Sequence, residues 1–310
     1  MYFNPARTKQ NYTIMNCNFT RYRGILTSIS FLFFWLIAVD GYGQLSVSGS
    51  SDANALANTL VGDGVQVLNA TLDCPTDGAG TFNGASSNIG IPSGVLLTSG
   101  SVNNAPGPNN SAFRGTNGLG GGDADLSALV GGAPICDACV LEFDFIPLAD
   151  RIRVQYVFAS EEYPELVCSP SFIDAFGFFV TGPDPGGGSY SNVNIATIGG
   201  SPVSTNSVNG GVVGSCLPCD AANRPPRGLG NTGSFVNNVG GASVQYDGFT
   251  VVFTAEIEVT PCETYHLKLA IGDSGDCLYD SGVFLEEGSL TSDFTCPSLP
   301  GGTFACESDI

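Results

Sequence analysis

Apolar and polar residues alternate along residues 151–159, in the stretch Arg-Ile-Arg-Val-Gln-Tyr-Val-Phe-Ala. Apolar side chains occupy every second position from Ile152 to Phe158, whereas Arg153 and Gln155 lie between them. Side chains alternate between the two faces of a β-strand, so one face of this segment would be apolar and the other polar. The pattern therefore predicts a strand in a sheet that is buried on one face.

Comparable apolar runs predict eight further strands. They lie at residues 65–72, 94–98, 140–146, 175–180, 194–198, 249–257, 264–271 and 282–286. The chain has 42 Gly and 18 Pro, and only 13% of its residues are charged, which leaves little room for helices. Two short helices are expected at residues 51–60 and 123–129, because Ser51, Asp52 and Asp123 can cap their first turns. We therefore predict an all-β fold, an antiparallel, jelly-roll-like β-sandwich with long Gly-rich loops and one or two short helices.

Two segments rich in Gly, Asn and Ser interrupt the strand pattern, at residues 100–122 and 182–241. Their low apolar content predicts that they are surface excursions that add little to the core. The strands suffice for one sandwich domain over residues 44–292, which is within the size range of a single all-β domain. Residues 293–310 are interpreted as a linker or the start of a further Ig-like module of a longer protein.

Acidic residues gather where several of the predicted strands begin or end. Six of them form our candidate metal site: Glu161, Glu162, Asp174, Asp273, Asp276 and Asp280. Calcium is a hard cation that prefers oxygen ligands, carboxylates above all, so the pattern predicts a calcium site in the loops of a β scaffold. The alternative is that these carboxylates are solvated loop charges and caps of strand ends.

Several ordered motifs resemble a known family, the choice-of-anchor L domain. They are Leu-Glu-Phe-Asp-Phe at 141–145, Phe-Ala-Ser-Glu-Glu-Tyr at 158–163, Asp-Ala-Phe-Gly-Phe-Phe at 174–179 and Asp-Ser-Gly-Val-Phe-Leu-Glu at 280–286. The resemblance extends over roughly residues 52–290. At position 173 this chain has Ile where the family more often has Asn, so the resemblance supplies no side-chain ligand there.

The resemblance implies a location and an architecture. Family members are bacterial secreted or surface proteins, in which one domain is attached to the cell by different C-terminal anchors in different lineages. Adhesion or surface display is the usual inference for them, and no established enzymatic activity comes with the family. We therefore expect a non-catalytic extracellular module, with an extracellular glycan or protein surface as its partner.

The N-terminal segment has the three parts of a secretory signal peptide. Arg21 and Arg23 precede an apolar run at residues 25–39, and Gly-Tyr-Gly follows at 41–43. We expect residues 1–43 to be removed, with Met15 as an alternative start, and the protein to be secreted or held at the cell surface. The run is short for a transmembrane helix, so an uncleaved anchor is the less favoured reading and no span is expected in the mature chain.

Charge narrows the choice of partners. The whole chain has a net charge of −19, and removal of the leader leaves 6 basic residues against 28 acidic ones, a net charge of −22. Such a surface repels the phosphates of nucleic acids and of anionic lipids, which disfavours both as partners. It attracts divalent cations, although acidity also serves solubility.

Cysteine usage agrees with export. Cys17 lies in the leader, and ten cysteines remain as disulfide candidates: Cys74, Cys136, Cys139, Cys168, Cys216, Cys219, Cys262, Cys277, Cys296 and Cys306. An even number in an exported chain favours disulfides, whose connectivity the sequence does not give. Two pairs have CxxC spacing, at 136–139 and 216–219, and zinc binding or redox catalysis are the alternatives there.

Catalytic readings have little support. Gly-Asp-Ser-Gly at 272–275 imitates the nucleophile motif of trypsin-like proteases. That fold needs its histidine far upstream in a separate barrel, whereas the one histidine, His266, lies just before the motif and should lie on an exposed strand face. Glu161 and Asp276 could serve a glycoside hydrolase, which needs two carboxylates at a set distance. Asp123 opens like an EF-hand loop, but Ala128 and Pro134 stand where that loop needs Gly and Glu. Display or adhesion, a polysaccharide-processing enzyme and a purely structural spacer remain the three function classes.

Overall fold

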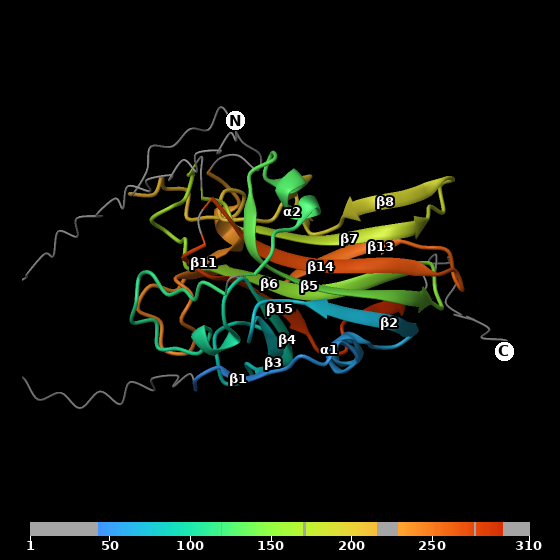
Figure 1. Cartoon of the computed structure of the whole chain (residues 1–310), viewed down its shortest axis with the longest axis horizontal. Coiled ribbons are helices and arrows are strands. Elements are labelled where there is room, and N and C mark those ends of the chain that lie inside the picture. Colours follow the sequence, from blue (N-terminus) through green and yellow to red (C-terminus); the bar gives the residue numbers. More distant parts are fainter. Residues whose placement is uncertain (1–42, 119, 170–171, 216–228, 276, 294–310) are drawn as a thin grey trace, which may run out of the picture. The chain divides into compact units, whose positions relative to one another are not determined.

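The computed structural model describes residues 43–118, 120–169, 172–215, 229–275 and 277–293 (Figure 1). Two antiparallel sheets contain almost all of its strands. The nine-stranded sheet has the order β1 (Ser46–Gly49), β3 (Ala79–Asn83), β4 (Ser93–Thr98), β15 (Ser281–Glu286), β6 (Arg151–Ser160), β12 (Gly248–Thr250) and β11 (Phe235–Asn237), with β13 (Phe253–Glu258) and β16 (Thr291–Asp293) also on β6. The five-stranded sheet has the order β2 (Val65–Asp73), β5 (Ile135–Pro147), β14 (Tyr265–Ser274), β7 (Ala175–Pro183) and β8 (Ser189–Asn194).

Strand β6 is the centre of the larger sheet and fixes its register. Near its end, Ser160 is paired with Ser281 of β15 and with Gly248 of β12. Near its start, Arg153 is paired with Glu256 of β13 and with Thr291 of β16. Two partner strands therefore run along each edge of β6, and their interruptions divide this strand into two halves.

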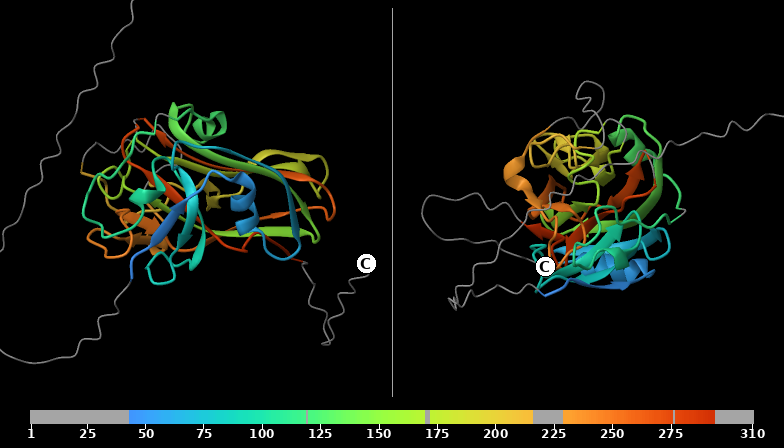
Figure 2. Two further views of the ribbon diagram at one scale, coloured as in Figure 1. Left: turned by 60° about the horizontal axis from the view of Figure 1, so that its bottom comes forward. Right: turned by 90° about the vertical axis from the view of Figure 1, so that its left-hand side faces the viewer.

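The two sheets pack face to face, as the views of Figure 2 show, and bury an apolar core between them. The larger sheet contributes Val95, Leu97, Tyr156, Phe158, Val283 and Leu285, and the smaller one Leu141, Phe143, Phe145, Phe176, Phe178, Leu267, Leu269 and Ile271. Rings cross this interface, with the Tyr156 and Phe178 centroids 5.0 Å apart in an edge-to-face arrangement. Such a pair adds about 0.5–1.5 kcal/mol beyond the buried area. The prediction of an antiparallel, all-β sandwich is confirmed.

Two short helices cover parts of this sandwich. Helix α1 (Ala53–Leu60) packs against β2 and β4, one strand from each sheet, and buries Leu56 and Leu60 in the core. Asp52 caps it by accepting a hydrogen bond from the Ala55 amide at 3.0 Å. Helix α2 (Ala124–Leu129) lies on the outer face of the smaller sheet, where Leu126 is buried. Both helices were predicted, and none in the described ranges is long and apolar enough to cross a membrane.

The segments predicted to be surface excursions are instead part of the packed structure. Val102 and Ala105, around the 3-10 turn η1 (Val102–Asn104), pack on the outer face of the larger sheet. Val203 and Val208 join the main core, beyond the small hairpin of β9 (Thr197–Ile198) and β10 (Ser201–Pro202). The prediction that these segments add little to the core was wrong, because a few apolar residues spaced among Gly, Asn and Ser are enough to anchor each one.

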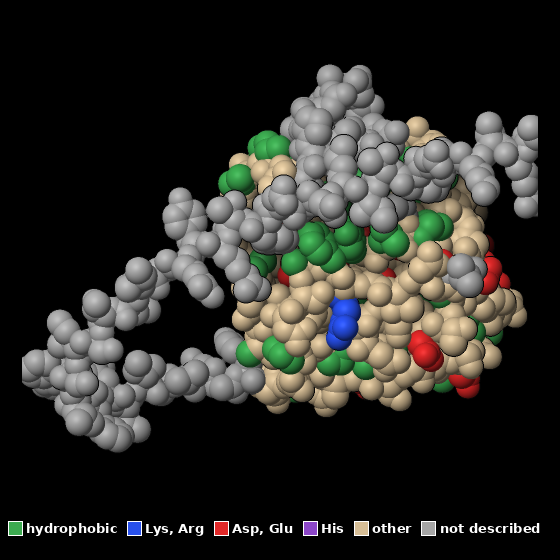
Figure 3. All heavy atoms as spheres, turned by 60° about the vertical axis from the view of Figure 1, so that its left-hand side comes forward, with side chains coloured by type: hydrophobic (Ala, Val, Ile, Leu, Met, Phe, Trp, Pro, Cys, Tyr) green, Lys and Arg blue, Asp and Glu red, His purple; other side chains and the backbone are tan. Residues whose placement is uncertain are grey.

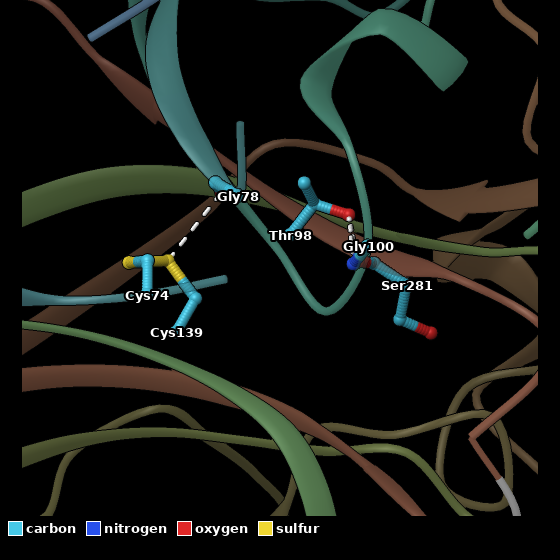
Figure 4. The surroundings of a disulfide bond; sticks show 6 residues. All are labelled: Cys74, Gly78, Thr98, Gly100, Cys139 and Ser281. Atoms are coloured by element: carbon cyan, nitrogen blue, oxygen red, sulfur yellow. Dashed lines mark hydrogen bonds between the residues drawn. A yellow bond between two sulfur atoms is a disulfide. The ribbon is translucent and has the colours of Figure 1, made fainter. Parts of the chain in front are cut away.

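Disulfides connect the strands at one end of the smaller sheet. Cys74 follows β2 and is bonded to Cys139 of β5, next to the register pair of Asp73 and Val140 (Figure 4). Cys136 of β5 is bonded to Cys277, which comes after β14. The two sulfurs of the first CxxC pair therefore have different partners, which excludes the zinc and redox readings for that pair.

The other cysteines divide into three groups. Cys168 is also disulfide-bonded. Cys262 is an exposed free thiol, so its prediction as a disulfide cysteine was wrong. It lies in the turn before β14, where its amide bonds the Pro147 carbonyl at the end of β5, whereas the bonded cysteines of β5 lie near its start. The remaining candidates, Cys216, Cys219, Cys296 and Cys306, lie outside the described residues. Residues 1–42 of the signal peptide expected at 1–43 lie outside them as well.

Candidate cation site at one end of the sandwich

Strand register gathers acidic residues at the end of the larger sheet where β6 finishes. Because Ser160 is paired with Ser281 on one side and with Gly248 on the other, the next residue, Glu161, lies between Asp280 and Asp247. The Glu161 amide donates to the Asp280 carbonyl at 3.1 Å, which extends the ladder by one residue. Three carboxylates thus form a row across this end of the sheet.

The smaller sheet brings acidic residues to the same end. Gly272 of β14 is paired with Ala175 of β7, so Asp273 lies beside Asp174. The Ser274 amide donates to Oδ1 of Asp174 at 3.4 Å. The two sheets are joined here, because the hydroxyl of Ser281 donates to Oδ2 of Asp174. We call this region, with Glu161, Glu162, Asp174, Asp247, Asp273 and Asp280, the carboxylate end.

The carboxylates form an inner and an outer group. The inner group consists of Glu162, Asp174 and Asp273: Oε2 of Glu162 accepts from the Asp174 amide at 3.3 Å, and Asp174 and Glu162 both repel the charge of Asp273. The outer group consists of Glu161 and Asp247, which repel each other on the far side of the larger sheet. Asp280 lies between the two groups, and its charge raises the pKa of both Glu161 and Asp273.

Both carboxylate oxygens of Asp280 accept hydrogen bonds from neighbouring loops. Oδ1 accepts from the Thr116 amide at 2.8 Å, and Oδ2 accepts from the Asn104 side-chain amide at 2.8 Å. A side chain on Gly100 would overlap this carboxylate, so the glycine is what allows the turn after β4 to lie against it. Figure 4 shows that turn, in which the Gly100 amide donates to the Thr98 hydroxyl near Ser281.

Asp273 is the least satisfied of these groups. Its exposed fraction is 1%, and neither of its carboxylate oxygens has a hydrogen bond of normal geometry. The Ser99 hydroxyl is close enough to favour the charged form, but burial and the charge of Asp174 outweigh it and raise the pKa of Asp273 well above its usual range. Leaving a carboxylate buried and unpaired costs several kcal/mol, so this group needs either a proton or a cation.

Burial also raises the pKa of three other carboxyl groups at this end. Burial, reinforced by Asp247, raises the pKa of Glu161 to about 9. Burial raises the pKa of Asp280 to about 6, against the hydrogen bonds from Asn104 and Thr116. Burial also raises the pKa of Asp247 to about 7, despite its hydrogen bond from Asn109. Burial therefore favours the neutral, protonated forms of these carboxyl groups over their charged forms.

Basic side chains neutralise acids elsewhere in the described structure. Lys268 lies 2.5 Å from Asp123 and 2.7 Å from Asp125, the two acids that resemble the opening of an EF-hand. His266 lies 2.9 Å from Asp144, and hydrogen bonds from Asn69 and His266 lower the pKa of that carboxyl group. No ion pair between described residues reaches Asp273, Asp247 or Glu161. Figure 3 turns this end toward the viewer, and few acidic side chains (red) are visible among its described surface atoms.

Five of the six residues predicted for the metal site lie at this end, and the sixth, Asp276, lies outside the described residues. Within the described ranges, no three His, Cys, Asp or Glu side chains are close enough together to hold a metal ion as they stand. Asp247 was missed, although Tyr-Asp at 246–247 precedes its strand as Tyr-Asp at 279–280 precedes β15. That repeated placement was the signal that could have found it.

The protease-like residues are not arranged for catalysis. His266 and Ser274 lie on the same strand, β14, eight positions apart, which places them about 26 Å apart. Ser274 and Asp273 are buried, whereas His266 lies on the partly exposed outer face beside Lys268, as predicted. Glu161 is 2% exposed, which leaves a glycan no access to its carboxyl group in this arrangement.

Fold and site together define a disulfide-linked β-sandwich domain with buried carboxylates where its two sheets meet. Residues 46–291 match the model of the family described as Choice-of-anchor L domain, and the chain therefore belongs to this family. Membership indicates a cell-surface-associated module of a bacterial surface or secreted protein, in a family not known as enzymatic. Comparison with curated proteins and with solved structures finds no match.

Proposed function

We propose that this protein is a non-catalytic adhesion or display module at the bacterial surface, whose carboxylate end is stabilised by calcium. The observation that carries the calcium part is Asp273, a buried carboxylate with two unpartnered oxygens beside Asp174 and Glu162. Calcium accepts hydroxyl and carbonyl oxygens as well as carboxylates. The inner group can therefore bind it after small side-chain movements, without three carboxylates already converging on one point.

Calcium binding is tested by thermal unfolding of the purified protein in EDTA and in millimolar calcium. A ligand that binds only the folded state raises the melting temperature as its concentration increases. We expect a rise of several degrees in the native protein and a much smaller one in Asp273→Asn. Asp73→Asn is the matched control, because Asp73 is exposed on β2. An equal rise in all three proteins, or none in the native one, would remove the inner site.

The adhesion part rests on the surface of the same end. Val212, Val239 and Leu278 belong to loops there, and their exposed fractions are 72%, 59% and 53%. Figure 3 shows apolar side chains (green) on this side of the molecule. Loops on a rigid sandwich commonly carry binding residues, and exposed apolar side chains are where contacts with a partner are favourable.

Adhesion is tested with beads that carry the protein and surfaces coated with extracellular glycans or proteins. We expect attachment to fall in a Val212→Ser, Leu278→Ser double variant while the melting temperature stays unchanged. A Leu148→Ser variant is the control, because Leu148 is 55% exposed in the turn at the opposite end of β5 and β6. Absence of attachment to every surface would support a purely structural spacer instead.

An enzyme is the other outcome to be distinguished. Hydrolysis of a glycan panel by the purified protein, lost in Glu161→Gln, would overturn the non-catalytic proposal. Export is part of the proposal as well, with the mature chain beginning near Gln44. N-terminal sequencing of secreted protein that still contained residues 25–39 would contradict it.

A further inference from the structure

The outer group of carboxylates contains a second unsatisfied acid, on the other side of the larger sheet from Asp273. Asp247 precedes β12 and is 1% exposed. Its Oδ1 accepts a hydrogen bond from the side-chain amide of Asn109 at 2.6 Å, whereas its Oδ2 is buried without a partner. A buried carboxylate oxygen of this kind loses its hydration without compensation.

A second buried oxygen without a partner lies nearby. Glu165 belongs to the turn that follows β6, and its Oε2 is buried and has no hydrogen bond. Glu165 is close enough to Asp247 for the two charges to repel each other. Two loops that are distant in sequence thus place two acidic side chains near each other, each with one buried oxygen that has no partner.

Glu161 completes the acidic side of this arrangement. It repels Asp247, and its own oxygens accept only long hydrogen bonds, from the Arg114 amide at 3.2 Å and from Gln245 at 3.4 Å. No described basic side chain forms an ion pair with Glu161, Glu165 or Asp247. The surroundings also provide neutral oxygens, since Oε1 of Gln245 lies here and accepts from the Asn110 amide at 3.3 Å.

We propose that Asp247, Glu165 and Glu161 bind a second divalent cation after side-chain movements, because as they stand they are not grouped closely enough to hold one. The site is distinct from the inner group and selective for a hard cation such as calcium. All of its candidate ligands are oxygens, which is the ligand set that calcium takes. A cation there would join the turn after β6 to the loop before β12 and, through Asn109, to the loop after β4. This site does not require the inner one, because Asp247 and Glu165 do not belong to the inner group.

The test counts calcium ions bound to the full-length mature protein, by native mass spectrometry and by calorimetric titration. Asp247→Asn and Glu165→Gln should each bind one ion fewer than the native protein, whereas the control Glu263→Gln, at an exposed position, should bind the same number. Glu165 is only partly buried, so Glu165→Gln decides the matter if Asp247→Asn fails to fold.

Asp273→Asn separates this site from the inner one. If only Asp273→Asn loses an ion, the outer site does not exist and the inner one does. If only Asp247→Asn and Glu165→Gln lose one, the inner site fails and the outer one remains. An unchanged ion count in Asp247→Asn and Glu165→Gln overturns the proposal. A higher melting temperature of Asp247→Asn in EDTA, with an unchanged ion count, would show instead that repulsion between the two carboxyl groups is uncompensated and that no cation binds there.

Discussion

Individual aspartates in this protein differ in what balances their charge. Asp123 has the ammonium of Lys268, and Asp144 has His266 and the amide of Asn69. Asp273 is more deeply buried than either and has no partner for its two oxygens. A carboxylate loses more solvation the deeper it lies, so the least compensated group is also the one that pays the largest desolvation cost. This contrast between residues of one type is the physical basis of the cation proposal.

The raised pKa values predict how stability depends on pH when calcium is removed. Burial raises the pKa of Glu161 from 4.5 to about 9, that of Asp247 from 3.8 to about 7 and that of Asp280 from 3.8 to about 6. Between the unfolded and folded values the folded protein binds more protons, so its stability falls as the pH rises. In EDTA we expect the melting temperature to fall from about pH 5 to about pH 9.

Calcium provides the control for this pH dependence. A bound cation replaces the protons, so the fall should be much smaller in millimolar calcium. Thermal unfolding followed by circular dichroism at both conditions measures the difference. A melting temperature that rises with pH in EDTA would contradict the raised pKa values.

Lys268 gives a second prediction at the level of one residue. Its side chain is 12% exposed and bonds the N-cap acid of α2, Asp123, as well as Asp125. Burial lowers its pKa, but the hydrogen bonds to the two aspartates outweigh this and raise it. Lys268→Met leaves two partly buried acids without their cation, and we expect a loss of about 1–3 kcal/mol in the free energy of unfolding.

The matched control for Lys268 is Arg153, whose side chain is 40% exposed in its ion pair with Glu256. Arg153→Met should cost less than about 1 kcal/mol, because exposed ion pairs contribute little. Urea unfolding at neutral pH compares the two variants. Equal losses in the free energy of unfolding would show that the burial of Lys268 does not strengthen its contacts.

At the level of elements, the sequence pattern located most of the structure. The strands predicted at 65–72, 151–159 and 282–286 agree with β2, β6 and β15 to within a residue at each end. Alternation was informative because each of these strands has at least one face against the core. The prediction at 249–257 merged two strands, β12 and β13, since the break at residues 251–252 does not disturb the apolar run.

The elements that were missed have weak local patterns. β1 (Ser46–Gly49) and β16 (Thr291–Asp293) are short and mostly polar, and they are strands because a partner lies beside them. Their formation depends on contacts distant in sequence, which a periodicity does not report. The loop segments were misjudged for a related reason, because anchors such as Val208 are single apolar residues in a polar context.

A prediction at the level of elements concerns the disulfides. Cys136 is paired in register with Asp273, so its bond to Cys277 holds the chain beside the inner carboxylates. Its two cysteines are 141 residues apart, and closing a loop of that size stabilises the folded state by about 4–5 kcal/mol in the chain-entropy model. Cys136→Ser, Cys277→Ser should therefore lower both the melting temperature and the calcium affinity.

The other disulfide serves as the comparison. Cys74 and Cys139 join neighbouring strands without including a residue of the carboxylate groups. Cys74→Ser, Cys139→Ser should lower the melting temperature with little change in calcium affinity, measured by calorimetric titration. Equal effects of both double variants on affinity would show that Cys277 has no particular role at the site.

At the scale of the whole molecule, the two ends of the sandwich differ in charge. β6 begins with Arg151 and Arg153, which form ion pairs with Glu256, Glu258 and Asp293 of the flanking strands. It ends about 30 Å away, near Asp247, Asp273 and Glu161, and no ion pair between described residues extends to these three carboxylates. In the described part of the chain, ion pairs therefore balance the acids at one end, whereas none extends to Asp273, Asp247 or Glu161 at the other.

The candidate site could be foreseen only in part. Acids directly before or after apolar runs, such as Glu161 and Asp280, were identified because strand ends meet at the edges of a sandwich. Their division into an inner and an outer group depends on which face each side chain takes, and this was not visible in the sequence. Glu165 was missed for the same reason, since only the folding of the turn after β6 brings it near Asp247.

The last prediction follows from this difference between the ends. If cations bind the carboxylate end, they should slow local opening there and leave the balanced end unchanged. Hydrogen exchange followed by mass spectrometry should show slower exchange in calcium than in EDTA at residues 161–169 and 238–247. Exchange at residues 254–258 and 291–293, beside Arg151 and Arg153, should stay the same. Slowing spread evenly over the sandwich would instead indicate that calcium acts on global stability alone, and no change at either end would contradict cation binding altogether.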